Sequence, residues 1–208
     1  MYTYDFYKNT CNLLKDCGFY PNRILDIGAN VCETADIMRD IWCDADILLF
    51  EGNNQCESIF INKRYKYHIK LLGKANDTVK FYKTKWSTLC SGNSIYRETS
   101  STYDDNTVII EMLPIYKLDD IVTDIYDLIK LDTQGSELDI IHGGLQTVSK
   151  AKVIIVEVSL KQINTGGCSK YDIMNILKQL NFDYIQTLES ILDIHGNSIQ
   201  ENLLYVKH

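Results

Sequence analysis

The sequence predicts an α/β fold: a doubly wound, mostly parallel sheet with an antiparallel hairpin at its C-terminal edge. Short apolar runs that do not alternate with polar residues, such as 24–27 and 153–158, recur along the chain and are separated by segments with helical spacing. Strands that are apolar on both faces and alternate with helices are typical of parallel sheets covered on both sides. The last two strand-like segments, 183–188 and 203–206, have no helix between them, so we expect them to form a hairpin.

The first third of the chain supplies three of the expected parallel strands. An opening helix is predicted within residues 1–20, because Tyr4, Tyr7, Cys11 and Leu14 fall on one helical face and Gly18 can end the helix. The segments that follow are, in order, a strand at 23–27, a helix around 35–42, a strand at 46–50, a helix at about 55–64 and a strand near 68–72.

The middle of the chain interrupts this alternation. Residues 79–83 alternate between polar and apolar and predict an added edge or hairpin strand. Residues 84–106 are rich in Ser, Thr, Asn and Tyr without any period, which favours a substrate loop or lid. The alternation then resumes with strands at 108–113, 128–131 and 153–158 and with helices at 136–149 and 170–180.

Length and composition indicate one soluble globular domain over residues 1–208, because 45% of the residues are hydrophobic and 24% are charged. A net charge of -7 argues against a nucleic-acid partner. The seven scattered cysteines include no Cys-x-x-Cys pair, which favours a reducing compartment. No apolar run approaches the ~20 residues that a membrane span needs. We therefore expect a cytoplasmic protein.

The segment around Gly28 predicts a cofactor site. A buried strand breaks at this glycine, and the next strand ends in Glu51, 25 residues after Asp26. A dinucleotide site would need Gly-x-Gly-x-x-Gly to bring a pyrophosphate onto a helix N-terminus. Here only one glycine is present, and Glu33 lies in the first helical turn, where it would repel phosphate. S-adenosylmethionine, which carries adenosine and positive charge but no phosphate, is the predicted cofactor.

Ligands of open α/β sheets bind beyond the carboxyl ends of the strands, and this rule selects the candidate cofactor residues. Glu51 follows five apolar residues, and a ribose diol would supply two hydrogen-bond donors to its carboxylate. Asp26 either holds the loop around Gly28 or meets the ammonium group of the ligand. The candidate cofactor-binding residues are Asp26, Gly28, Ala29, Asn30, Glu51, Asn53, Ala75 and Asn76.

Two carboxylates are candidates for the chemical step. Asp132 and Glu157 end neighbouring segments of predicted strand, and paired strands would bring them within ~4.8 Å of one another in the sheet. Converging acids favour either a proton acceptor with a raised pKa or a site for a divalent cation such as Mg²⁺. The alternative for Asp132 is a cap on the following helix.

The chain resembles the FkbM family of S-adenosylmethionine-dependent methyltransferases over roughly residues 22–207. The resemblance lies in residues 25–31, 50–51, 118–119 and 129–138, and the Lys-Leu-Asp segment that continues into Gln134 and Glu137 is its most specific part. It implies a Rossmann-like methyltransferase fold that O-methylates sugars or sugar-bearing substrates. It also implies that Asp26, Gly28, Asn30 and Glu51 line the cofactor site and that Asp132, Gln134 and Glu137 border the reaction centre.

Two residues depart from the family pattern. Cys32 stands where a second glycine is common, and Gly52 stands where proline is common. The predicted function is S-adenosylmethionine-dependent O-methylation of a hydroxyl on a sugar or glycosylated substrate. The alternative is a catalytically inactive scaffold or binding protein with the methyltransferase fold.

Overall fold

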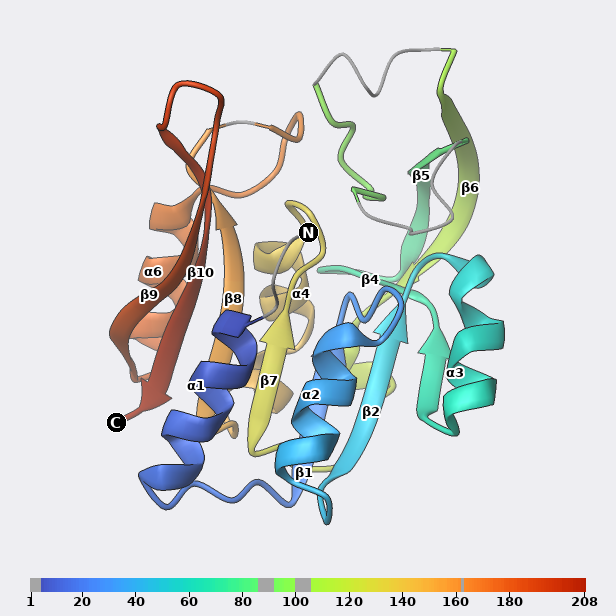
Figure 1. The fold of residues 1–208 in the computed structure, drawn as a ribbon. Coiled ribbons are helices and arrows are strands. Elements are labelled where there is room, and N and C mark those ends of the chain that lie inside the picture. Colours follow the sequence, from blue (N-terminus) through green and yellow to red (C-terminus); the bar gives the residue numbers. More distant parts are fainter. Residues whose placement is uncertain (1–4, 86–91, 100–105, 162) are drawn as a thin grey trace.

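A seven-stranded sheet runs through the protein, which is described by a computed structural model for residues 5–85, 92–99, 106–161 and 163–208 (Figure 1). Its first five strands pair in parallel, and the last two form an antiparallel hairpin. The predicted fold class is therefore confirmed. The strands are, in spatial order, β3 (Lys66–Ile69), β2 (Asp46–Glu51), β1 (Arg23–Ile27), β7 (Leu128–Leu131), β8 (Val153–Ser159), β10 (Ser198–Lys207) and β9 (Phe182–Leu192).

Helices cover both faces of this sheet and bury two separate apolar cores. One face packs against α1 (Asp5–Asp16), α2 (Glu33–Ile41) and α3 (Glu57–Lys63), the last preceded by the 3-10 turn η1 (Asn54–Cys56). The other packs against α4 (Glu137–Gly143), α5 (Leu145–Val148), α6 (Lys170–Gln179) and the 3-10 turn η3 (Leu118–Asp120). In α1 the buried residues include Tyr7, Cys11 and Leu14 of the predicted apolar face, and Tyr4 lies outside the described residues.

The single helix predicted over 136–149 is instead divided into α4 and α5. The division falls at Gly143 and Gly144, where the chain packs closely against its neighbours. A Cβ atom on Gly143 would lie 2.0 Å from the carbonyl oxygen of Gly73, and one on Gly144 would lie 2.7 Å from a methyl carbon of Leu118. Glycine at both positions permits this approach and lowers the helix propensity where the turn occurs.

A second, three-stranded sheet stands beside the carboxyl ends of the main sheet (Figure 1). Its spatial order is β4 (Leu71–Leu72), β6 (Val108–Tyr116) and β5 (Asp77–Thr84). The strand predicted near 68–72 is thus split, because the chain leaves the main sheet after β3 and enters the small one at β4. The predicted added strand at 79–83 is confirmed as part of β5.

Part of the expected lid lies outside the described residues, namely 86–91 and 100–105. Of the described part, Ser94 pairs with Tyr82, and Glu98 pairs with Asn164. No helix in the described ranges is long and apolar enough to cross a membrane.

Candidate active site

Most residues of the site lie side by side on neighbouring strands of the main sheet, in one row that runs across the strands. In the parallel strands Phe50, Ile27, Leu131 and Val156 are in register, and the next residue of each strand belongs to the row. The hairpin extends the row, because Asn202 of β10 lies opposite Glu157 and Glu189 of β9 lies opposite Asn202. These residues all line one cavity of about 240 Å³. The row is, in order, Glu51, Gly28, Asp132, Glu157, Asn202 and Glu189.

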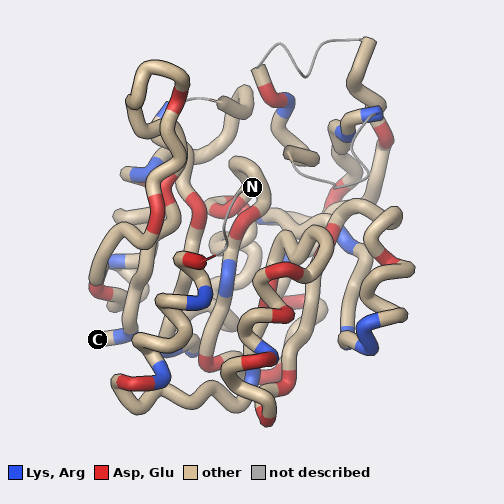
Figure 2. Tube along the Cα trace, viewed as in Figure 1, with Lys and Arg blue, Asp and Glu red and all other residues tan. Residues whose placement is uncertain are grey.

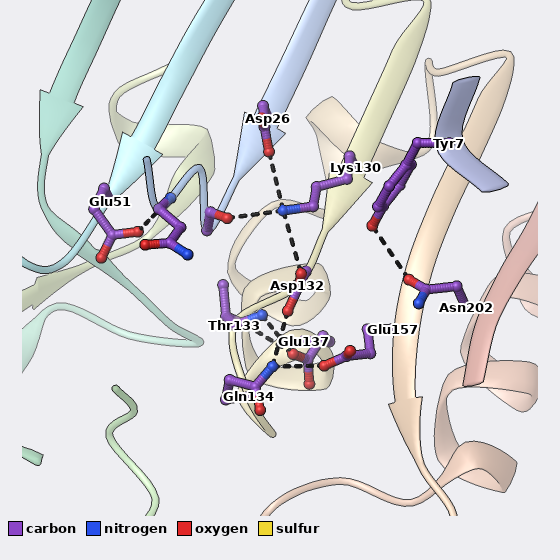
Figure 3. Close-up of polar contacts among 12 residues, drawn as sticks. Tyr7, Asp26, Glu51, Lys130, Asp132, Thr133, Gln134, Glu137, Glu157 and Asn202 are labelled. Atoms are coloured by element: carbon purple, nitrogen blue, oxygen red, sulfur yellow. Dashed lines mark hydrogen bonds and ion pairs between the residues drawn. The ribbon is translucent and has the colours of Figure 1, made fainter. Parts of the chain in front are cut away.

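The Glu51 carboxylate is held by backbone amides at one end of this row (Figure 3). The backbone N–H of Asn53 donates to Oε1 at 2.8 Å, and that of Asn30 donates to Oε2 at 3.0 Å. Burial raises the pKa of the carboxyl group, and these two hydrogen bonds oppose the rise. A carboxylate offers about four acceptor positions, so Glu51 keeps capacity for donors that enter the cavity.

The loop after β1 brings backbone close to the site. Gly28 has φ +80°, and a Cβ atom there would lie 1.7 Å from the backbone oxygen of Asp132, so no larger residue fits. Asn30 also has a positive φ, at 48°, and lines the cavity. Its Oδ1 is buried, and no described residue donates a hydrogen bond to it. Such an atom favours a ligand that brings a donor.

Lys130 ties this loop to the reaction centre from below the row. Its ammonium nitrogen lies 3.2 Å from Asp26 Oδ1 and 3.4 Å from Asp132 Oδ2, and it donates to the Gly28 carbonyl oxygen at 2.8 Å (Figure 3). Burial raises the pKa of Asp26, and the adjacent ammonium opposes the rise. Asp26 is buried and does not line the cavity. Of the two roles considered for it, the geometry favours holding the loop.

Asp132, Gln134 and Glu157 form a hydrogen-bonded group above Lys130. The Gln134 side-chain amide donates to Asp132 Oδ1 at 3.0 Å and to Glu157 Oε2 at 2.6 Å. Burial, with the nearby Asp132 charge, raises the pKa of Glu157 well above its ordinary value. Glu157 therefore keeps its proton to a higher pH than an ordinary glutamate. The Asp132 side chain is 27% exposed and lines the cavity beside an ammonium group.

The predicted divalent-cation site at Asp132 and Glu157 is not supported. The described residues contain no group of three or more His, Cys, Asp or Glu side chains placed to hold a metal ion. The Gln134 amide already donates to both carboxyl groups, and Lys130 supplies the local positive charge. The raised pKa of Glu157 also makes it a poorer ligand for a hard cation, which prefers ionised oxygen donors.

Glu137 lies behind the loop rather than in the cavity. Its carboxylate accepts the backbone N–H groups of Thr133 at 2.7 Å and Gly135 at 3.0 Å. Glu137 is buried and is absent from the residues that line the cavity. The backbone acceptor of this turn is therefore Glu137, and the cap considered for Asp132 is not what the structure shows.

The remaining predicted cofactor residues lie outside the cavity. The backbone N–H of Asn53 donates to the Glu51 carboxylate. Ala29 is buried, and its backbone N–H donates to the Phe50 carbonyl oxygen at 3.0 Å. Ala75 and Asn76 are exposed, and Asn76 binds the η3 turn, where its Nδ2 donates to Asp120 Oδ2 at 2.7 Å. They lie there because the chain leaves the main sheet after β3, before it reaches them.

Four residues of the site are absent from the sequence prediction. Lys130 could have been found, because a lysine inside a four-residue apolar strand needs a buried partner. Tyr7, Asn202 and Glu189 line the cavity from α1 and the hairpin. The Tyr7 hydroxyl donates to Asn202 Oδ1 at 3.2 Å across nearly the whole length of the chain, and no local pattern signals that contact.

Comparisons with known proteins identify the family and the fold of this chain. Residues 26–184 match the methyltransferase FkbM domain family. The crystal structure of methyltransferase FkbM from Methylobacillus flagellatus matches with a TM-score of 0.55 at 14% identity, over 89% of this chain and 43% of that one. This chain therefore spans less than half the length of that protein. No curated protein sequence matches the chain.

Two further solved structures have the same fold. Magnesium protoporphyrin IX methyltransferase from Synechocystis, crystallised with bound S-adenosylmethionine, matches with a TM-score of 0.55 at 10% identity, over 98% of this chain and 81% of that one. A putative O-methyltransferase from Klebsiella pneumoniae matches with a TM-score of 0.54 at 10% identity, over 100% and 82%. The predicted resemblance is confirmed, and the chain belongs to the family of methyltransferase FkbM domains.

Proposed function

We propose that this protein is an S-adenosylmethionine-dependent O-methyltransferase that acts on a hydroxyl group of a sugar or glycosylated substrate. One observation carries the proposal: Glu51 and Asp132 line the same cavity, with Gly28 between them in one row of the sheet. With strands ~4.8 Å apart, the two acids are separated by about 10 Å, which suits the ribose and the reactive end of one nucleoside cofactor.

The residues at the Glu51 end fit that cofactor. Glu51 retains acceptor positions for ribose hydroxyls, and the buried Asn30 Oδ1 awaits a donor. Phe50, Leu72 and Phe81 add apolar surface to the cavity for a base. When bound, S-adenosylmethionine supplies an electrophilic methyl group. The crystal structure of the Synechocystis methyltransferase with bound S-adenosylmethionine supports this assignment.

At the other end, Asp132 is the proposed acceptor for the proton of the substrate hydroxyl. Its Oδ2 is held by Lys130 and its Oδ1 by the Gln134 amide, so the carboxylate is fixed in one orientation. In this arrangement Gln134 is a positioning residue and Asp132 is the general base.

Isothermal titration with S-adenosylmethionine tests the cofactor assignment. Glu51→Ala should weaken binding on the order of 10- to 100-fold, because one or two hydrogen bonds to a carboxylate are lost. Glu57→Ala is the matched control. Glu57 is an exposed acid at the start of α3, and among the described residues its carboxylate accepts a hydrogen bond from the Tyr67 hydroxyl alone. Its loss should leave the affinity for S-adenosylmethionine unchanged. No binding by the unaltered protein, or equal affinity in all three, would overturn the assignment.

Methyl transfer to a panel of sugars and glycolipids separates an enzyme from an inactive scaffold. Asp132→Asn should reduce turnover at least ~100-fold while retaining cofactor binding, since general-base catalysis contributes about 10²–10⁴-fold. If the protein binds S-adenosylmethionine but methylates no member of the panel, the scaffold is the better description. Full activity of the Asp132→Asn variant would remove Asp132 from the role of base.

A further inference from the structure

The C-terminal hairpin extends the site beyond the reaction centre. Asn202 of β10 lies opposite Glu157 of β8 on one side and opposite Glu189 of β9 on the other. All three line the cavity, on the side away from Glu51. Acidic residues gather along the hairpin and at the carboxyl ends of the central strands (Figure 2). A cofactor that occupies the row from Glu51 to Asp132 leaves this end of the cavity for a second ligand.

Two polar groups at this end are not engaged by the protein. Asn202 is 3% exposed, and its Oδ1 accepts the Tyr7 hydroxyl, but its Nδ2 donates to none of the described residues. Glu189 forms no hydrogen bond or ion pair with any residue in the described ranges, although its neighbour Glu201 is bonded to Lys170 at 2.5 Å. A buried amide donor and an unpaired carboxylate, both facing one cavity, favour a ligand that offers an acceptor and a positive donor.

Of the residues that the structure describes, none that lines this end of the cavity carries positive charge. Lys70 is the one basic residue among the described residues that line the cavity, and it belongs to the Glu51 end, where its ammonium lies 4.0 Å from the centre of the Tyr116 ring. Lys83 is buried and paired with Glu111 at 2.6 Å. A methyl-accepting substrate that carried phosphate or carboxylate would be repelled by Glu189, and no described cation at this end would offset that repulsion.

The same wall also offers apolar surface. Phe6 and Tyr7 of α1 line the cavity, with their ring centres 4.0 Å apart. Aromatic faces beside amide and carboxylate groups suit a ring that is hydroxylated at its edge and apolar on its face.

We propose that Glu189, Asn202 and Tyr7 form the acceptor subsite and that it takes an amino sugar, whose protonated amine pairs with Glu189. The proposal rests on the proposed methyltransferase function and specifies its substrate class. Glu189 and Asn202 determine specificity, whereas Asp132 remains the base.

Ligand-observed saturation-transfer NMR tests this subsite, with the protein saturated by S-adenosylhomocysteine. The probes are glucosamine, glucose and glucose 6-phosphate at millimolar concentration. We expect glucosamine to bind most tightly and glucose 6-phosphate least. Glu189→Gln should weaken glucosamine about 5- to 10-fold and leave glucose unchanged, because an ion pair that is partly exposed contributes about 1 kcal/mol.

Asp183→Asn is the matched control, since Asp183 is an exposed acid on the same strand that pairs with His208 outside the cavity. It removes the same charge and should leave the glucosamine-to-glucose affinity ratio unchanged. An equal change in both variants, no change in Glu189→Gln, preferred binding of glucose 6-phosphate, or binding of none of the probes would each overturn the amino-sugar assignment. Titration with S-adenosylhomocysteine is made first: its failure to bind would overturn the proposed function, whereas normal cofactor binding without amine selectivity overturns this inference alone.

Discussion

Replacing Lys130 by methionine is the sharpest test of how the site is held together. The substitution keeps an unbranched side chain of similar length but removes the ammonium that lies 3.2 Å from Asp26 and 3.4 Å from Asp132. Asp26 is fully buried, and no other described residue pairs with it. Removing one partner of a buried ion pair costs about 3–5 kcal/mol. Since the free energy of unfolding of a domain is about 5–15 kcal/mol, the variant should lose a large part of its stability.

Urea unfolding followed by circular dichroism measures this cost. Lys152→Met is the control: Lys152 pairs with Asp127 at 2.8 Å, but its side chain is 64% exposed, so its loss should cost less than about 1 kcal/mol. In the double variant Asp26→Asn with Lys130→Met no ionised carboxylate is left unpaired at Asp26. Its loss in the free energy of unfolding should therefore be smaller, by at least ~2 kcal/mol, than the sum of the losses in the two single variants.

The cost of Lys130→Met should also depend on pH. Burial raises the pKa of Asp26, and Lys130 is the group that lowers it, so the pKa rises further in the variant. An acid with a higher pKa in the folded than in the unfolded state loses stability as pH rises between those two values. The deficit should therefore be smaller at pH 5 than at pH 8. Three results would refute this account of the buried pair. They are a loss in the free energy of unfolding below 1 kcal/mol for Lys130→Met, a loss that does not change with pH, and a double variant whose loss equals the sum of the two single ones.

Three further variants test other parts of the site. Gly28→Ala should cost more than ~2 kcal/mol in urea unfolding and abolish cofactor binding, because its Cβ would lie 1.7 Å from the Asp132 backbone oxygen at a positive φ; a stability close to that of the unaltered protein would contradict this. Glu137→Gln should destabilise by about 1–3 kcal/mol, since the amide nitrogen that replaces one carboxylate oxygen cannot accept the backbone N–H which that oxygen now receives, and an unchanged urea midpoint would count against that role. The pKa of Glu157 is raised, so this group costs stability as pH rises above the ordinary range of a glutamate; Glu157→Gln should gain stability relative to the unaltered protein between pH 5 and 8, and parallel pH profiles would show that Glu157 is ionised in the folded state.

The cofactor end of the site could be predicted from the sequence because it depends on local patterns. An apolar strand that ends in an acid places that acid at the carboxyl edge of a parallel sheet, whatever the strand order. Glu51, Gly28 and Asp132 were found in this way and line one cavity. The backbone of Cys32 fits the same pattern, since its φ of 70° lies in the left-handed region, where glycine is easily accommodated and where the family commonly has one.

The end of the cavity that contains Asn202 and Glu189 could not be predicted in the same way. Asn202 and Glu189 reach the cavity only because β10 lies between β8 and β9 in one antiparallel register, and a shift by one residue would turn both side chains to the other face. Ala75 and Asn76 were assigned to the cofactor site on the assumption that one strand runs to residue 72. The chain instead changes sheets after Ile69, which removes them from the cavity.

A crystal structure with S-adenosylhomocysteine tests the central claim most directly. The account predicts that both ribose hydroxyls lie within hydrogen-bonding distance of the Glu51 carboxylate and that the sulfur lies on the Asp132 side of Gly28. A nucleoside bound elsewhere, or bound in this cavity with its ribose away from Glu51, would contradict it.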